Sequence, residues 1–569
     1  MSQAINRSAA RPADLPDSAI ADFSFGMQKM PHVLAQLGWP SLRPGQKDVV
    51  KTVMLGYDCV GILPTAAGKT GCYVVPALCM GWRTIIISPL LALMADQEAS
   101  MQRMGVKAAR LTSDVSPAQA QSVLNDWACG NLQIMLVSPE RVSNPAWRSV
   151  VMQFPPDFMA MDEAHTFSQW ADTFRSGYKF AGDFVREVNP KVVLALTATC
   201  PPEMEEEIRA GLSIQNARRV FYYPTRENLK LHTLDLKSPT AFAPWVAANC
   251  PGSTIVYCAT RKNVEEMCAD LQRYVRDREV VFYHGGITSP AVKKEAQDRW
   301  TYSDDTIIVA TNAFGMGIDK PNVRSVVHYD LPGTLSALVQ EAGRAGRDGE
   351  ISHCWAYQNQ KAISTQRYFI RIGNPTEGDV RSVLEQFRKM QDVDGTIHAN
   401  RILVAQKADV DAGMMGAIMT FMYGERLVEE VKDVSAPARL RWATAIPSFT
   451  PAESQTRDAL HMVSREAGGW LEFNIDELAN QLSLKPATIG QRLTSMAAKG
   501  LFTYVRQDSR KPIRIVGDPD RVDFSRINQK AGEAHEKLDE VIAYCDVPDE
   551  DKHAYLNRTM KTNEAPATV

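Results

Sequence analysis

Three short segments of this sequence combine residue types that could together handle a nucleotide. The first, Pro64-Thr65-Ala66-Ala67-Gly68-Lys69-Thr70, follows a short apolar run and precedes a helix-like segment. Backbone N–H groups at such a helix start can cradle phosphates, the Lys69 ammonium can reach the terminal phosphates, and the Thr70 hydroxyl can bind Mg²⁺. We therefore expect ATP to contact Thr65, Ala66, Ala67, Gly68, Lys69 and Thr70. Leu63 replaces the first glycine of the usual pattern, so for this loop alone a chance Gly-Lys-Thr turn stays open.

The second segment, Asp162-Glu163-Ala164-His165, comes directly after the apolar run Phe158–Met161. Two adjacent carboxylates at a strand end are costly unless they bind something. We expect Asp162 to hold Mg²⁺ through water and Glu163 to orient the attacking water as a base, with His165 among the catalytic residues. The alternative is an acidic turn at the surface.

The third segment runs from Gln340 to Arg347 and contains Arg344 and Arg347 among small residues. Two arginines three residues apart share one face of a helix. They would act as arginine fingers that stabilise charge on a transferring phosphoryl group, with Gln340 beside them. A solvated basic helix is the alternative.

Short apolar runs alternate with helix-like segments through the first ~370 residues, which is typical of buried parallel strands joined by helical crossovers. Two series of such runs predict two tandem, RecA-like, doubly wound α/β domains, at 26–215 and 216–372, with the joint near Ser213–Asn228. The predicted strands are Cys59–Leu63, Thr84–Ile87, Ile134–Val137, Phe158–Met161 and Val192–Leu196, then Thr254–Cys258, Val280–Tyr283, Thr306–Ala310, Val323–Tyr329 and Cys354–Tyr357.

The chain changes character after about Arg371. Three helices followed by two strands, Leu501–Val516, indicate a winged helix (α+β) at 448–520, and a similar unit is predicted at 373–447. Residues 521–569 are expected to form a helical pair with a polar tail, and residues 1–25 an extended or disordered tail without an apolar signal core.

Composition narrows the class of protein. The 569 residues are 45% hydrophobic and 23% charged, which is ordinary for a globular protein, and the formal net charge is −3. Nucleic-acid binding would therefore need a local basic surface. The ten cysteines include no C-x-x-C pair, so we expect reduced thiols and a cytoplasmic protein. No apolar stretch is long enough for a membrane span, and we expect no membrane partner.

In motif content and order, residues 30–372 resemble the superfamily 2 helicases, and among them the RecQ family of 3′→5′ DNA helicases. Leu42-Arg43-Pro44-Gly45-Gln46 resembles that family's adenine-reading element, and further matches lie at Ile87–Gln97, Ser138–Arg141, Thr197–Thr199 and Ala310–Asp319. The resemblance implies nucleotide contacts for Arg43, Gln46, Gly317 and Asp319. It implies contacts to the DNA backbone for Ser88, Pro89, Gln97, Thr260, Arg261 and Thr311.

The segment Ser168-Gln169-Trp170-Ala171-Asp172-Thr173-Phe174-Arg175 resembles the aromatic-rich loop by which RecQ helicases sense single-stranded DNA. Trp170 and Phe174 offer faces on which any base can stack, and Arg175 can add a backbone or cation–π contact. Gln169 belongs to the same expected DNA-binding set. Without the resemblance, two aromatics at this spacing would be read as core residues.

The sequence departs from the family after the second α/β domain, where RecQ helicases commonly carry a four-cysteine zinc module. No cysteine lies between Cys354 and Cys545, and one cysteine cannot make a zinc site. We expect no zinc, and a C-terminal helical pair held by packing in its place. Stoichiometric zinc in elemental analysis would contradict this.

These features predict an ATP- and Mg²⁺-dependent DNA helicase that acts on single-stranded and forked DNA, as a monomer rather than an oligomer. Three alternatives stay open: an RNA helicase or remodelling ATPase, a DNA-tethering module whose ATPase is vestigial, and a DNA-stimulated translocase that does not unwind. We expect the wing of the second winged helix to contribute Arg506, Arg510 and Lys511 to DNA binding, although a solvated β-ribbon would look the same in sequence.

Overall fold

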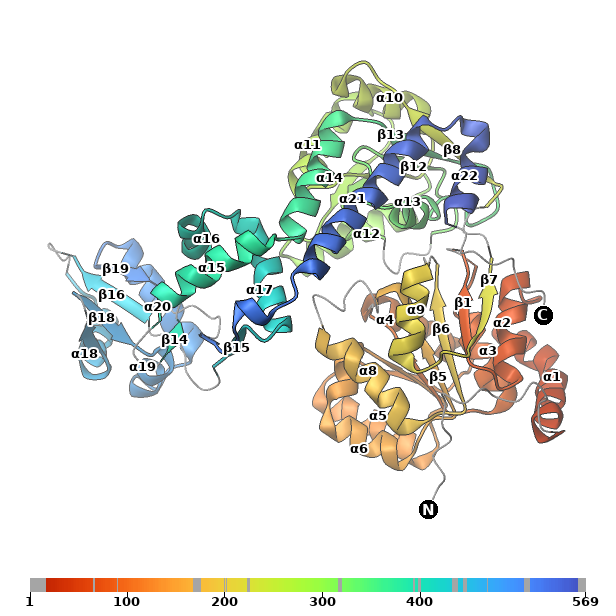
Figure 1. Cartoon of the computed structure of the whole chain (residues 1–569), viewed down its shortest axis with the longest axis horizontal. Helices are drawn as coiled ribbons and strands as arrows, with labels where there is room; N and C mark the ends of the chain where they lie inside the picture. The colour runs from red at the N-terminus through yellow and green to blue at the C-terminus, as the bar shows by residue number, and fades with distance from the viewer. Residues whose placement is uncertain are drawn as a thin grey trace. The chain divides into compact units, whose positions relative to one another are not determined.

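The computed structural model describes the chain in ranges separated by short gaps. These are residues 17–64, 67–89, 91–166, 175–198, 200, 202–222, 226–315, 320–391, 395–397, 401–431, 438–443, 448–467, 469–505 and 512–560. Contacts divide the chain into two compact units, Met1–Ile370 with Gly532–Val569, and Arg371–Ala531 (Figure 1). The first holds the two predicted sheet domains. Among the described helices, none is both long and apolar enough to cross a membrane.

The first sheet has seven strands in the order β3-β4-β2-β5-β6-β1-β7, and every pair is parallel. Its strands are β1 (Cys59–Ile62), β2 (Thr84–Ile87), β3 (Ala108–Leu111), β4 (Ile134–Val137), β5 (Phe158–Met161), β6 (Val192–Thr197) and β7 (Arg218–Phe221). The central strands are buried along their whole length, so apolar cores cover both faces of the sheet.

Two helices precede the first strand of this domain, and the others connect successive parallel strands, as crossovers must. They are α1 (Asp17–Leu37), α2 (Pro44–Met54), α3 (Gly71–Met80), α4 (Leu91–Arg103), α5 (Pro117–Cys129), α6 (Pro145–Gln153), α8 (Arg175–Val188) and α9 (Pro202–Leu212), with a 3₁₀ turn at Pro139–Ser143. The predicted N-terminal tail through residue 25 is wrong for its last part, because α1 begins at Asp17. Phe23, Met30 and Leu34 of α1 pack against the core of the sheet, which is why the helix forms.

The second sheet is also fully parallel, with six strands in the order β10-β11-β9-β12-β13-β8. The strands are β8 (Leu229–Leu234), β9 (Thr254–Tyr257), β10 (Val280–Tyr283), β11 (Ile307–Ala310), β12 (Ser325–His328) and β13 (Ser352–Tyr357). The helices are α10 (Phe242–Asn249), α11 (Arg261–Tyr274), α12 (Pro290–Tyr302), α13 (Leu335–Ala342) and α14 (Gln360–Gly373). The two RecA-like domains predicted from the apolar runs are thus confirmed.

The predicted boundary between the sheets at residue 215 needs correction. β7 pairs with β1 and so belongs to the first sheet, which ends at Phe221. Two arginines in β7 interrupt the apolar pattern, and for that reason the sequence does not predict this strand.

The C-terminal helical pair consists of α21 (Ser525–Asp546) and α22 (Lys552–Thr559). Val541, Tyr544, Cys545 and Leu556 join the core on one face of the second sheet, and α22 lies beside β8 (Figure 1). The Lys552 side chain is fully buried and donates to Thr233 Oγ1 and to the carbonyls of residues 544 and 547. The structure therefore has a helical pair packed against the second sheet in this C-terminal segment.

The second unit contains two small domains of helices and antiparallel strands. One comprises α15 (Glu377–Lys389), β14 (Thr396–Ile397), α16 (Arg401–Ala408), α17 (Met415–Gly424), β15 (Val428–Glu430) and β20 (Ile513–Ile515). The other comprises β16 (Ala438–Trp442), α18 (Pro451–Val463), β17 (Arg465–Ala467), β18 (Trp470–Phe473), α19 (Ile475–Gln481), α20 (Pro486–Ala498) and β19 (Phe502–Val505). Each has its own apolar core and its own antiparallel sheet.

The second small domain is inserted into the first, which corrects the predicted boundaries 373–447 and 448–520. Val431 donates to the carbonyl of Pro512, so the two ends of the insertion meet. β19 and β20 were expected to form one ribbon, but β19 pairs with β16 whereas β20 pairs with β14 and β15. The order of segments in the sequence does not reveal this arrangement, because both partners of β20 lie far upstream in the chain.

Candidate functional site

The phosphate loop and the acidic pair lie at the same edge of the first sheet. The loop follows β1 and the acidic pair follows β5, and only β6 separates these strands. The carboxyl ends of parallel strands are where α/β sheets bind ligands. Thr65 and Ala66 lie outside the described residues. Gly68 has φ +73°, a conformation that suits glycine at the tight turn before α3.

The Lys69 ammonium lies 3.2 Å from Glu163 Oε1 and donates a second hydrogen bond of 3.3 Å to Oε2. Burial alone would raise the pKa of Glu163, but the charge of Lys69 and its hydrogen bond to the carboxylate outweigh burial and lower the pKa. Arg344 of the second sheet domain adds to the same lowering. Glu163 is therefore an ionised base that cations surround.

Asp162 differs from its neighbour because, among the described residues, no cation forms an ion pair with it. Burial raises the pKa of Asp162, and the adjacent Glu163 carboxylate raises it further. Asp162 Oδ1 accepts a hydrogen bond from the Glu163 N–H, and Glu163 has φ +51°, which is rare for a residue with a side chain. Because of this unfavourable backbone conformation, the two successive carboxylates have different partners, Lys69 for Glu163 and Tyr73 for Asp162.

His165 connects the acidic segment to the end of β6. Its Nδ1 forms a 3.1 Å hydrogen bond with Thr197 Oγ1 and lies 3.3 Å from Glu163 Oε2. Burial lowers the pKa of His165, so the ring is neutral at pH 7. It can relay a shift of Glu163 to Thr197.

Tyr73 is a site residue that the sequence analysis missed. From α3, one turn after the phosphate loop, its hydroxyl donates to Thr70 Oγ1 at 3.4 Å and to Asp162 Oδ2 at 3.5 Å. It also accepts a 2.8 Å hydrogen bond from the Gln97 amide. A hydroxyl-bearing aromatic in an otherwise apolar helix was the signal that could have identified it.

Two residues predicted to contact DNA are buried in the interior. Gln97 is 8% exposed and uses its amide on Tyr73, and Ser88 is fully buried. Both side chains are buried in this structure, and their contacts to a DNA backbone stay predictions. Pro89, between them in sequence, is half-buried.

The adenine-reading residues lie against the phosphate loop. Gln46 is buried, its amide donates to the Gly68 carbonyl at 2.6 Å, and its Oε1 accepts from the Arg43 N–H at 2.8 Å. Gln46 thus links the Arg43 backbone to the phosphate loop, and the nucleotide contacts expected of Arg43 and Gln46 stay predictions.

Gln340 lies in α13, but Arg344 and Arg347 do not share a helix face, which corrects the sequence interpretation. The helix ends at Ala342, and both arginines lie in the following turns, residues 343–350, which we call the arginine loop. Arg344 is buried and donates to the Gly315 carbonyl, while its Nε has no hydrogen-bond partner among the described residues. Gly317 and Asp319 lie outside the described residues.

The remaining predicted DNA-binding residues fall into two groups. Thr260 caps α11 through Asn263 N–H, Arg261 is exposed, and Thr311 is buried. Outside the described residues lie Gln169, Trp170 and Phe174, the side chain of Arg175, and Arg506, Arg510 and Lys511.

The described residues fit ATP with Mg²⁺. A hydroxyl and a carboxylate, from Thr70 and Asp162, are the hard oxygen donors that Mg²⁺ takes beside phosphate oxygens. The buried Arg344 Nε lacks a partner, which suits a group that donates to an incoming anion. Elsewhere, within the described ranges, no three His, Cys, Asp or Glu side chains gather so as to hold a metal ion.

Comparison with known proteins agrees with this geometry. Residues 43–208 match the DEAD/DEAH box helicase family, and residues 241–349 match the helicase conserved C-terminal domain. The probable ATP-dependent DNA helicase RecS of Bacillus subtilis (strain 168) is 32% identical over 411 residues, which cover 71% of this chain and 82% of the relative. The chain belongs to the RecQ-like family of ATP-dependent DNA helicases.

Other RecQ-like relatives match a smaller share of their own length. The ATP-dependent DNA helicase RecQ of Bacillus subtilis is 35% identical over 359 residues, 62% of this chain and 60% of the relative. The RecQ of Haemophilus influenzae is 35% identical over 313 residues, 55% of this chain and 50% of the relative. This RecQ-like chain thus spans between half and four fifths of these relatives.

Proposed function

We propose that the chain couples ATP hydrolysis to 3′→5′ movement along single-stranded DNA and thereby unwinds forked duplexes. The observation that carries the proposal is the composite site. Lys69, Thr70, Asp162 and Glu163 come from the first sheet domain, and Arg344, whose charge lowers the pKa of Glu163, comes from the second. A site assembled from two domains lets nucleotide chemistry drive domain movement.

The residues divide the work as follows. Lys69 and the loop N–H groups hold the phosphates, and Glu163, ionised under the charges of its cationic neighbours, takes the proton from the attacking water. Arg344 and Arg347 stabilise the charge that develops on the transferring group. Mg²⁺, held by Thr70 and Asp162, would supply charge neutralisation of the phosphates.

Contacts to the DNA track are proposed for Pro89, Thr260, Arg261 and Thr311 and for the aromatic loop with Gln169, Trp170, Phe174 and Arg175. Arg261, the most exposed of the described set, lies over Gly286, where a Cβ atom would be 2.7 Å from its Cδ. Contacts of this kind hold phosphates and read no sequence. Stacking on Trp170 and Phe174 would make the track single-stranded.

One experiment tests the proposal and separates it from the alternatives. ATPase activity is measured with single-stranded DNA, duplex DNA and RNA, and strand separation with forks that carry a 3′ or a 5′ tail. We expect stimulation by single-stranded DNA and unwinding from the 3′ tail. Stimulation by RNA alone would identify an RNA helicase, and stimulation without strand separation would identify a translocase.

A matched variant tests the aromatic loop. Trp170→Ala should keep the basal ATPase rate and lose about tenfold or more of the stimulation by single-stranded DNA, since base stacking contributes about 1–3 kcal/mol per base. Undiminished stimulation would mean that Trp170 is a core residue.

A further inference from the structure

Arg226 lies where the chain enters the second sheet domain, just before β8, and reaches across to the arginine loop. Its Nη2 donates to the carbonyls of Gly343 at 2.8 Å and Ala345 at 2.6 Å, and its Nη1 donates to the carbonyl of Gly346 at 2.8 Å. One guanidinium thus binds three backbone carbonyls of the loop that carries Arg344 and Arg347. The two terminal nitrogens of a planar guanidinium lie apart and can reach acceptors at separate positions of the loop, whereas the three donors of a lysine all come from one atom.

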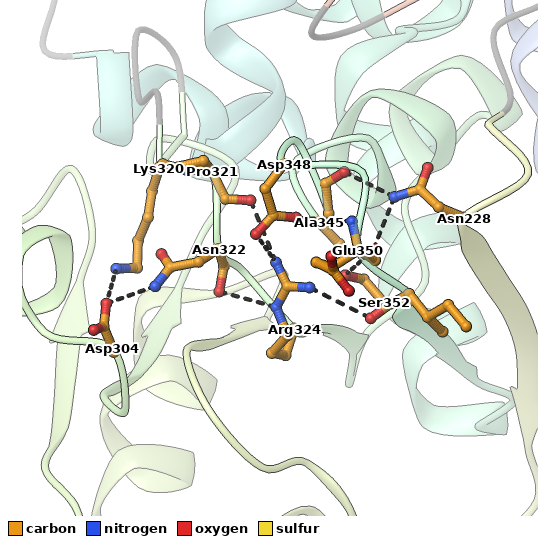
Figure 2. A network of polar contacts seen from close by, with 12 residues as sticks. Asn228, Asp304, Lys320, Pro321, Asn322, Arg324, Ala345, Asp348, Glu350 and Ser352 are labelled. Carbon is orange, nitrogen blue, oxygen red and sulfur yellow. Dashed lines mark hydrogen bonds and ion pairs between the residues drawn. The ribbon is translucent and has the colours of Figure 1, made fainter.

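Asn228 holds the same loop from the same strand end. Its amide donates to the carbonyls of Gly346 at 2.8 Å and Glu350 at 2.9 Å, and its own carbonyl accepts from the Ser352 N–H (Figure 2). On the other side, Arg324 pairs with Asp348 of the loop, and the two groups point toward each other in Figure 2. The arginine loop is therefore fixed from both flanks.

The loop has the shape that these contacts require. Gly346 has φ +55°, and a Cβ atom there would lie 2.5 Å from Asn228 Nδ2 and 2.7 Å from Ser352 Oγ. Only glycine permits both this turn and the close approach of the clamp. The turn follows the end of α13, so Arg344 and Arg347 do not share a helix face.

Keeping Arg226 charged in this partly buried position costs free energy, and this favours a functional role for the residue. Burial lowers the pKa of Arg226, and the nearby Arg347 lowers it further. Its hydrogen bonds go to neutral carbonyls rather than to a carboxylate. A half-buried cation beside another cation would not be retained for stability alone.

We propose that Arg226, assisted by Asn228, is a positioning residue that sets the shape of the arginine loop, and so the reach of Arg344 and Arg347 to the transferring phosphoryl group. The proposal rests on the proposed ATPase function. It assigns to the start of the second sheet domain a role in the rate of hydrolysis, because movement of this segment would move the arginines.

Arg226→Lys tests the proposal in the full chain, because it keeps the charge and removes the fork. We expect kcat for ATP with saturating oligothymidine to fall about 10- to 100-fold, because a small misplacement of catalytic groups can cost up to about 100-fold, while KM for ATP and the melting temperature stay near the wild-type values. The control is Arg278→Lys. Arg278 is a buried arginine of the same sheet domain that donates to the Gly252 carbonyl rather than to the loop, so its substitution should leave kcat unchanged.

A double-variant cycle separates this inference from the function on which it rests. Arg344→Ala alone should abolish most of the ATPase activity, and adding Arg226→Lys should then reduce single-turnover hydrolysis by less than about twofold, because residues that act as a unit are not additive. If Arg344→Ala hydrolyses ATP normally, the proposed function is wrong. If Arg344→Ala is impaired but Arg226→Lys matches Arg278→Lys, or if the two effects multiply, the positioning role is wrong. Should Arg226→Lys fail to fold, Asn228→Ala carries the same test, with a fall in kcat of about tenfold expected because two hydrogen bonds to the loop are lost.

Discussion

At the scale of single residues, the phosphates of ATP and the Glu163 carboxylate compete for one cation. Lys69 has a single ammonium, and both of its hydrogen bonds in the structure go to Glu163. When Lys69 turns to a phosphate, Glu163 loses its closest counter-ion and becomes a stronger base. Binding of substrate would thereby activate the group that must deprotonate water.

Glu163→Gln should bind ATP at least as tightly as the wild type and hydrolyse it about 100-fold more slowly or worse. The amide releases Lys69 from its ion pair but cannot accept the proton from water, and general bases typically contribute about 10²- to 10⁴-fold. A fluorescent ATP analogue measures binding, and phosphate release measures turnover. Glu98→Gln is the control, because Glu98 pairs with Arg110 away from the site; normal turnover by Glu163→Gln would refute the assignment of the base.

Tyr73→Phe should lower kcat by about three- to tenfold with little loss of stability. The lost hydroxyl joins Thr70, Asp162 and Gln97, and a single hydrogen bond is worth about 0.5–1.5 kcal/mol. The Mg²⁺ concentration for half-maximal activity should rise, because Thr70 is no longer oriented. Tyr57→Phe serves as the comparison, since the Tyr57 ring lies under Arg218 outside the site; an equal effect of both variants would mean that Tyr73 is only a core residue.

At the scale of elements, the strands of the two parallel sheets that the apolar pattern did not predict share one property, which is their place at a sheet edge. β3 and β7 are the two edges of the first sheet, and β8 is an edge of the second. An edge strand has one neighbour and tolerates charge, as in Arg110 of β3 and the two arginines of β7. Central strands have unbroken apolar runs because both their faces are buried, and these were predicted nearly to the residue.

The candidate site was similarly predictable only in part. Lys69, Asp162 and Glu163 could be predicted from the sequence, because charged groups that follow buried strands are not explained by packing. Tyr73, Arg226 and Asn228 do not, since hydroxyl and amide groups occur throughout any fold and their partners are backbone atoms far away in sequence. Gln97 and Ser88 were placed on DNA by resemblance, and only the packing of the segment shows that they are buried.

Lys552 is the residue on which attachment of the C-terminal helical pair depends. Lys552→Met would leave the acceptors Thr233 Oγ1, Tyr544 O and Val547 O without their shared donor, at a cost of about 2–4 kcal/mol. We expect hydrogen exchange of residues 532–560 to speed up while the first sheet domain stays protected.

Lys320→Met provides the matched control for this prediction. Lys320 is also a buried lysine of the second sheet domain whose ammonium donates to two carbonyls, those of Thr301 and Ser303. Its loss should destabilise the domain without freeing the helical pair. Equal exchange of residues 532–560 in both variants would show that Lys552 has no special role in docking.

At the scale of the whole molecule, the inserted small domain allows a test of whether ATPase activity and the unwinding of forked DNA can be separated. Its boundaries meet at the hydrogen bond from Val431 to the Pro512 carbonyl, between the antiparallel strands β15 and β20. An inserted domain whose two ends are adjacent can be deleted without distorting the domain that contains it. The candidate ATP site lies in the other compact unit.

Replacing residues 432–511 by Asn-Gly, with Pro512→Thr to restore an N–H donor, should close β15 and β20 into a two-residue hairpin. We expect the shortened chain to fold, and its ATPase activity with single-stranded DNA to stay within about twofold of the wild type, because the nucleotide site and the aromatic loop are untouched. Affinity for forked DNA should fall about tenfold, the loss expected when several phosphate contacts disappear at moderate salt, and strand separation should fall further. Replacing Arg506, Arg510 and Lys511 together by Gln in the full chain asks whether the wing carries this effect. Unwinding of forks at the wild-type rate by the shortened chain would mean that the inserted domain does not meet the duplex.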